Sequence, residues 1–296
     1  MRAYPWVLLL GVAIMWDSAA RGGENLFAHD NLVAWCIVPF DAKRRGPEER
    51  AAMLERLGIK RLAYDWRGEH VPTFDAEVDA LQRHGIELAA WWFPTTLDRD
   101  AQTILAVLER HKLKTQLWVM GGGGPTKDEA EQRARVEAEA RRIRPIAEAA
   151  AKIGCTVELY NHGGWFGDPE NQLAIIGQLK LPNVGIVYNL HHGHEHLDRF
   201  PQLLKKMLPH LHALNLNGMT KGGEQILPLG QGALDLELLK TIRESGYRGP
   251  IGILNHTGED AEARLQDNLD GLAWLVPQLD GQPAGPRPSP RSWHRR

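Results

Sequence analysis

Residues 155–162 read Cys-Thr-Val-Glu-Leu-Tyr-Asn-His, a short apolar strand pattern that runs into an asparagine and a histidine. Similar endings, each with an apolar run before asparagine, recur at 184–192, 211–217 and 250–256. A glycine follows each of the four, directly or after one residue. Because polar groups recur at the same end of successive strands, these segments predict one shared site.

Strand and helix signals alternate along the rest of the chain. Strands are expected at 31–38, 61–64, 86–92, 116–120, 155–159, 184–188, 211–214 and 250–254, and helices at 48–57, 74–84, 101–111, 127–153, 169–179, 197–208, 235–245 and 260–275. The long helix is expected to kink or restart at Pro145. This alternation over about 250 residues predicts a single-domain α/β fold, the (β/α)8 TIM barrel. No glycine fingerprint follows the first strand, which argues against an open doubly wound sheet.

Four segments are expected along the chain: a signal peptide at 1–20, a linker at 21–30, the barrel at 31–277 and a disordered Pro/Arg-rich tail at 278–296. Arg2, the apolar run 6–16 and the small residues 18–20 have the order of a secretory signal. We therefore expect a periplasmic or extracellular protein; the alternative is an uncleaved N-terminal anchor.

Composition narrows the classes of partner. The formal net charge of −2, with 43% hydrophobic and 24% charged residues, is typical of a soluble protein and disfavours nucleic acid or an anionic membrane as partner. Cys36 and Cys155 both lie in apolar runs, which favours two buried free thiols, although export would permit a disulfide. No paired-cysteine spacing indicates structural zinc. The oligomeric state is left open.

A family resemblance rests mainly on residues 229–250. Leu229-Gly230-Gln231-Gly232, a helix from Asp235, and Ser245-Gly246-Tyr247-Arg248-Gly249-Pro250 resemble the pattern before the last strand of the sugar phosphate isomerase/epimerase family. These are the xylose isomerase-like TIM barrels, grouped with AP endonuclease family 2. The endings Asn161-His162 and Asn189 to His192 are similar to the endings of the family's middle strands. The resemblance implies a barrel that acts on a small carbohydrate.

In that family, Glu, Asp, His and Glu from four strand ends hold a divalent metal. This chain keeps His192 but departs at the other positions, where Tyr160, Asn189, Asn215, Asn217 and the run Leu254-Asn255-His256 stand. Hard cations prefer charged oxygens over neutral amides, so the usual metal site is expected to be lost.

An imidazole site is the alternative. His162, His192 and His256 could hold Zn²⁺ or a similar ion, which would make the protein a histidine-based metal-dependent isomerase. The run from His191 to His196 has the composition of a metal loop. It is equally the polar opening of the next helix, with solvated side chains. Cofactor use is therefore either none or one divalent metal.

The favoured function is isomerase, epimerase or related lyase chemistry that begins with proton abstraction next to a sugar carbonyl. Expected catalytic residues are Tyr160, His162, His192 and His256. Expected substrate-binding residues are Asp65, Arg67, Trp92, Asn161, Trp165, Asn189, Asn215, Asn217 and Asn255. Two alternatives stay open: a sugar-binding barrel without catalysis, and asparagines that only cap helices or tie loops together. An exported protein favours a free or oxidised sugar over a phosphate ester.

Overall fold

The computed structural model describes residues 26–291 and shows a closed barrel in which β1 to β8 follow one another in chain order. Every neighbouring pair of strands is parallel, and β8 closes the barrel against β1. This confirms the single-domain (β/α)8 barrel expected from the alternation. The expected signal peptide and the first half of the expected linker lie outside the described residues.

The strands are β1 (Leu32–Trp35), β2 (Arg61–Tyr64), β3 (Glu87–Phe93), β4 (Gln116–Val119), β5 (Thr156–Tyr160), β6 (Val184–Asn189), β7 (Leu211–Leu216) and β8 (Ile251–Leu254). Each lies within an expected strand or differs from it by a few residues at its ends. Most strand residues are buried on both faces, as parallel barrel strands require.

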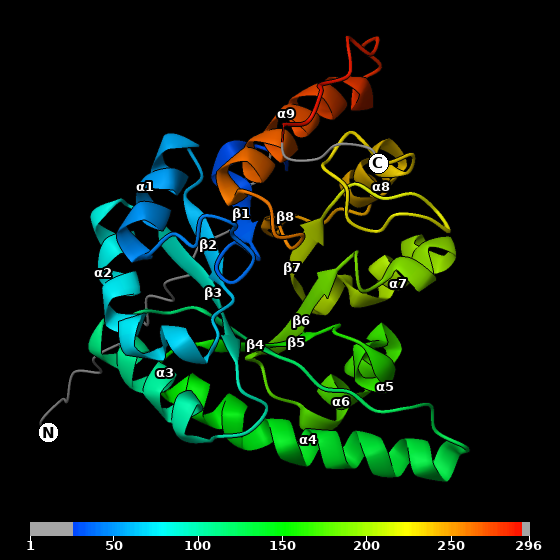
Figure 1. Ribbon diagram of the computed structural model, residues 1–296. Coiled ribbons are helices and arrows are strands. Elements are labelled where there is room, and N and C mark those ends of the chain that lie inside the picture. Colours follow the sequence, from blue (N-terminus) through cyan, green and yellow to red (C-terminus); the bar gives the residue numbers. More distant parts are fainter. Residues whose placement is uncertain (1–25, 292–296) are drawn as a thin grey trace, which may run out of the picture.

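The helices are α1 (Pro47–Arg56), α2 (Phe74–Arg83), α3 (Arg99–Arg110), α4 (Glu129–Lys152), α5 (Gly164–Gly167), α6 (Pro169–Leu179), α7 (Phe200–Met207), α8 (Asp235–Glu244) and α9 (Ala261–Leu279). In Figure 1 they surround the strands in chain order, from α1 on the left through α4 at the bottom to α9 at the top. The expected restart at Pro145 is wrong, because α4 continues through it. Pro145 is exposed, so water can satisfy the carbonyl that its missing N–H leaves free.

Large and small side chains alternate inside the barrel. Trp35 and Trp118 pack with ring centroids 4.1 Å apart, and Ala63, Ala90 and Ala213 make room for them. Deeper in the barrel, the buried carboxylate of Glu158 lies 2.8 Å from Nδ1 of His212. Gly185 is required there, since a Cβ would lie 2.5 Å from the His212 ring. The imidazole of His212 thus gives the buried carboxylate a hydrogen-bonding partner.

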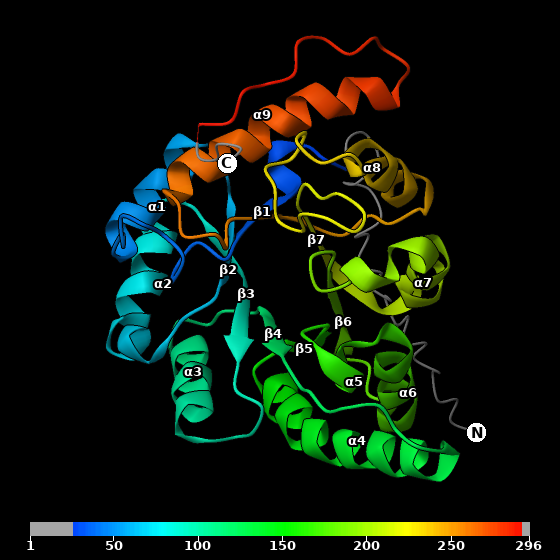
Figure 2. The same cartoon turned by 45° about the vertical axis from the view of Figure 1, so that its right-hand side comes forward.

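Residues 285–291 run along α9 and contact it. Trp274 Nε1 donates to the carbonyl of Gly285, and the Arg291 guanidinium lies 2.8 Å from both Asp267 and Asp270. Figure 2 shows this segment running back along the helix, where composition had favoured a disordered tail. Across residues 26–291, the structure has no helix long and apolar enough to cross a membrane.

Candidate active site

A cavity of about 640 Å³, here called the central cavity, opens at the carboxyl ends of the strands. Its lining comes from the ends of β1 to β6 and of β8: Cys36, Phe40, Asp65, Trp66, Arg67, Gly68, Trp92, Phe93, Pro94, Thr95, Asp98, Asp100, Met120, Tyr160, His162, His192 and His256. This is the end of the barrel at which active sites of this fold lie. All four expected catalytic residues line it, as do Asp65, Arg67 and Trp92.

Aromatic side chains form much of the wall. Trp92 packs edge to face against Tyr160, with ring centroids 5.6 Å apart, and its carbonyl accepts a 2.7 Å hydrogen bond from Trp66 Nε1. On the other side, Phe40 lies 4.2 Å from the His256 ring and under the guanidinium of Arg67. Such a wall offers flat apolar surface to the face of a sugar ring.

The imidazoles gather on one side of the cavity. The ring of His192 lies 4.5 Å from that of His162 and 4.7 Å from that of His191. Burial and the neighbouring histidines lower the pKa of His191 to about 4 and that of His192 to about 3. Burial also lowers the pKa of His256. These three rings are therefore neutral at neutral pH, and each can donate or accept a hydrogen bond.

Asp65 is the buried carboxylate of the cavity. Its Oδ1 accepts a hydrogen bond from the backbone N–H of Val38, whereas Oδ2 has no hydrogen-bond partner among residues 26–291. Burial raises the pKa of Asp65 to about 7, although the positive charge of Arg67 opposes the shift. Arg67 does not pair with this carboxylate, because its Nη1 donates to the backbone carbonyls of Asp65 and Trp66.

Backbone strain lies at the same place. Cys36, just after β1, has φ 52°, and His256, just after β8, has φ 90°. Residues other than glycine adopt these values rarely, and such positions concentrate at functional sites. Both Cys36 and Cys155 are buried free thiols, as expected. The carboxylate of Asp65 lies close enough to Cys36 to help burial raise the pKa of the thiol.

Two strand-end asparagines, Asn189 and Asn215, are hydrogen-bonded to Tyr160 and to each other and do not line the central cavity. Asn189 Nδ2 donates to the Tyr160 hydroxyl at 2.9 Å, and Asn189 Oδ1 accepts from Asn215 Nδ2 at 2.9 Å. Asn189 and Asn215 are buried and do not line the cavity. The structure thus brings them together as a hydrogen-bonded network beneath the site. We call Tyr160, Asn189 and Asn215 the amide network.

The other asparagines tie the backbone together. Asn161 Nδ2 donates to the carbonyl of Asn189, and the Asn189 N–H donates back to Asn161 Oδ1. Asn217 donates to the carbonyls of Gly218 and Gln225, and Asn255 donates to the carbonyl of Phe40. Asn161 also lines a neighbouring cavity, together with the expected residue Trp165.

The amide network does not fit a divalent cation at the positions that the family resemblance indicates. Asn189 Oδ1, the oxygen that would replace a carboxylate ligand, already accepts two N–H donors, from His191 and Asn215. Burial raises the pKa of Tyr160 well above its usual range, so the phenol keeps its proton. Neutral donors that are already hydrogen-bonded bind hard cations weakly.

The imidazole alternative lacks a ready geometry as well. Within residues 26–291, no three His, Cys, Asp or Glu side chains are placed to hold a metal ion together. The ring of His256 lies 5.6 Å from that of His191, a residue of the expected metal loop that is not one of the three expected ligands. A zinc site at His162, His192 and His256 stays a prediction.

Sequence reasoning missed several lining residues, notably Cys36, Phe40, Trp66 and Met120. Their signal was positional, since each lies at or just after the end of an expected strand in the first half of the chain. Apolar side chains at strand ends occur equally often in the core, so the residue type alone did not mark these four as lining residues.

Comparison with protein families gives a match over residues 40–277 to the xylose isomerase-like TIM barrel. The chain belongs to this family. No curated protein is similar enough to match. Membership confirms the resemblance found in the sequence, while the amide network marks where this xylose isomerase-like barrel departs from it.

Solved structures of similar fold include 3-keto-D-glucoside 4-epimerase from E. coli, at 16% identity and a TM-score of 0.63, covering 84% of this chain and 99% of the other. D-psicose 3-epimerase from Clostridium cellulolyticum, solved with D-tagatose, has 14% identity and a TM-score of 0.57, covering 83% and 99%. A xylose isomerase domain protein from Planctomyces limnophilus has 16% identity and a TM-score of 0.59, covering 86% and 100%. At these identities, the likeness establishes the fold.

Proposed function

We propose that this barrel is a sugar isomerase or epimerase whose proton-transfer group is Asp65. The observation that carries the proposal is a buried carboxylate on the central cavity whose Oδ2 has no hydrogen-bond partner among residues 26–291. Similar folds act on small sugars, as the names of the two epimerases state. The aromatic wall and the cavity volume of about 640 Å³ suit a ligand of that class.

Proton affinity favours Asp65 over the imidazoles as the base. A general base works best when its pKa lies near the operating pH, and the pKa of Asp65 is raised to about 7. The pKa of His192 is lowered to about 3, so its ring holds an abstracted proton poorly. His192 and His256 then serve as neutral hydrogen-bonding groups for sugar hydroxyls.

Tyr160 supplies the second part of the chemistry. Its hydroxyl oxygen accepts a hydrogen bond from Asn189, so its own proton is free to point at a substrate oxygen. Asp65 takes the C–H proton next to the carbonyl, and the electron pair of that bond moves onto the carbonyl oxygen. Tyr160 stabilises the resulting enediolate. Return of the proton from Asp65 to the neighbouring carbon, with transfer of the hydroxyl proton on the first carbon to the former carbonyl oxygen, gives isomerisation. Epimerisation requires a second proton donor, such as water, on the opposite face of the enediolate.

Deuterium exchange tests the proposal directly. Sugars that raise the melting temperature, drawn from D-fructose, D-tagatose, D-psicose and D-xylose, are incubated with the enzyme in D₂O and followed by proton NMR. We expect loss of the signal of the proton next to the carbonyl, with Asp65→Asn slowing exchange at least 100-fold. Asp30→Asn, the same change at an exposed position in a short 3-10 helix, is the matched control. Exchange that survives in Asp65→Asn would refute the role of Asp65.

A sugar-binding barrel without catalysis is the second candidate. The observation in its favour is that the side-chain amides of Asn189, Asn215 and Asn217 already donate hydrogen bonds to acceptors within the protein. Under this reading, a sugar that stabilises the protein shows no deuterium uptake in the unaltered protein. The same NMR experiment therefore separates the two candidates.

Export is part of the proposal and rests on the order of charged, apolar and small residues at 1–20. Expression of the full chain in a bacterium with a periplasm, followed by fractionation and N-terminal sequencing, tests it. A mature protein that starts near Arg21 is expected, and an intact N-terminus in the cytoplasmic fraction would contradict export.

A further inference from the structure

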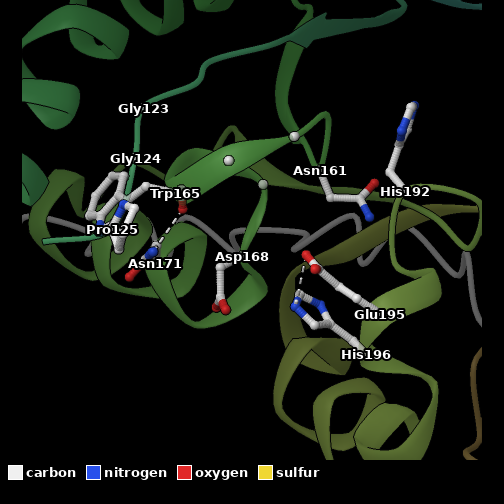
Figure 3. Close-up of a pocket in the computed structure, with 13 residues that line it drawn as sticks. Gly123, Gly124, Pro125, Asn161, Trp165, Asp168, Asn171, His192, Glu195 and His196 are labelled. Carbon is white, nitrogen blue, oxygen red and sulfur yellow. Dashed lines mark hydrogen bonds and ion pairs between the residues drawn. The ribbon is translucent and has the colours of Figure 1, made fainter.

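A second cavity of about 470 Å³, here called the side cavity, lies beside the central one. Its lining comes from the loops after β4, β5 and β6: Gly123, Gly124, Pro125, Asn161, Gly163, Gly164, Trp165, Gly167, Asp168, Asn171, His192, Glu195 and His196. Figure 3 shows Trp165 and Pro125 on one side and His192, Glu195 and His196 on the other.

The two cavities share a wall. His192 lines both. At the end of β5, Tyr160 and His162 line the central cavity, while Asn161 between them lines the side cavity. A ligand that occupied both cavities would therefore contact His192.

The residues that line the side cavity suit a neutral ligand that carries hydroxyl groups. Its lining contains the carboxylates of Glu195 and Asp168, of which Asp168 is paired with Arg199 at 3.2 Å, and no lysine or arginine, so the lining itself offers an anionic ligand no positive charge. His196 brings a buried Nδ1 that has no hydrogen-bond partner among residues 26–291. The Trp165 side chain adds apolar surface.

We propose that the substrate is a disaccharide or other glycoside, with the reacting sugar in the central cavity and a neutral glycosyl unit in the side cavity. This proposal rests on the proposed function, since it places the reacting sugar beside Asp65. The side cavity then determines specificity: a monosaccharide fills only part of the site, and a phosphorylated second unit finds no positive charge in the lining.

Two glycines provide a matched test. A side chain at Gly124 meets no atom within 4 Å of its Cβ, and the residue has no positive φ, so phenylalanine fits the backbone and can extend into the side cavity. Gly122 has the same freedom but does not line the cavity. Gly124→Phe therefore blocks the side cavity, and Gly122→Phe is its control.

The probes are D-fructose with maltulose and lactulose, and D-glucose with maltose and cellobiose, each titrated by calorimetry. We expect at least one disaccharide to bind tenfold or more tightly than its monosaccharide. Gly124→Phe should abolish that gain and leave monosaccharide affinity unchanged, while Gly122→Phe keeps it. The Glu195 side chain is 81% exposed, so its removal should not disturb folding. Glu195→Ala should reduce the gain in disaccharide affinity severalfold.

The outcomes separate the two proposals. Monosaccharide binding or exchange without any gain for a disaccharide, or a gain that survives Gly124→Phe, overturns the glycoside proposal and leaves the proposed function standing. No binding of any of these sugars, together with no deuterium exchange, overturns both.

Discussion

A single buried carboxylate separates this site from a simple sugar-binding surface. Asp65 is 1% exposed, yet it lines the central cavity and its Oδ2 lacks a hydrogen-bond partner among residues 26–291. Burying a polar atom without a partner costs free energy, so the position carries a stability cost that a binding or catalytic role would explain.

This cost predicts a pH dependence of stability. The pKa of Asp65 is raised to about 7 in the folded protein, against about 3.9 in an unfolded chain, so its contribution is fully present below pH 4 and is lost as pH rises through 7. The total loss is on the order of 4 kcal/mol at about 1.36 kcal/mol per pH unit, of which roughly 2.7 kcal/mol falls between pH 5 and pH 8. Asp65→Asn should remove this fall, measured by urea unfolding at pH 5 and pH 8.

The unaltered protein has to be compared with Asp65→Asn, because the titration of other groups changes the stability with pH in the opposite direction. The pKa values of His191 and His192 are lowered, so their contribution is present above pH 6.5 and is lost as pH falls towards 4 and 3. Subtracting the Asp65→Asn data from those of the unaltered protein isolates Asp65. An unchanged pH profile in Asp65→Asn would contradict the raised pKa.

At the scale of elements, the asparagines after the strands act mainly on the backbone. Asn161 joins the ends of β5 and β6 through two buried hydrogen bonds, at 3.0 and 2.7 Å. We predict that Asn161→Ala lowers the free energy of unfolding by about 2 kcal/mol, because it leaves the buried N–H of Asn189 without this acceptor, while the carbonyl of Asn189 keeps the N–H of Gly193. Denaturant unfolding measures the change.

Asn183→Ala provides the comparison, since Asn183 makes one partly buried hydrogen bond, to the carbonyl of Ala147. Its cost should be about 1 kcal/mol. If both variants lower the free energy of unfolding equally, the two hydrogen bonds that join β5 and β6 stabilise the protein no more than a single partly buried one.

Sequence patterns predicted the elements well and the contacts of their last residues less well. All eight strands were found because apolar runs alternate with amphipathic helices, a signal that spans many residues. Whether Asn189 reaches into the cavity or turns to Tyr160 depends on neighbours from other strands, which the local pattern does not contain. The short helix α5 was missed because Gly163-Gly164 reads as a loop; both glycines have positive φ.

At the scale of the whole molecule, the protein keeps the family's barrel while its strand ends carry neutral groups. We predict that added Mn²⁺ or Mg²⁺ neither raises the melting temperature nor changes sugar binding, because the amide network already occupies its own hydrogen-bonding groups. Thermal unfolding with each ion and with EDTA measures this.

Zn²⁺ is a separate case, because its proposed ligands would be imidazoles. Titration of protein purified without a histidine tag, with His192→Ala and His256→Ala as comparisons, tests that site. Stoichiometric binding that both variants remove would establish the imidazole site and contradict a metal-free enzyme.

The strained residues Cys36 and His256 follow the first and the last strand, which pair where the barrel closes. The central cavity therefore takes its walls from both ends of the chain. A growing polypeptide has no complete site until nearly the whole barrel has been synthesised. A bound sugar would contact both ends together and shift the equilibrium towards the closed barrel. Ligand binding at this seam would thus be coupled thermodynamically to the pairing of the first and last strands.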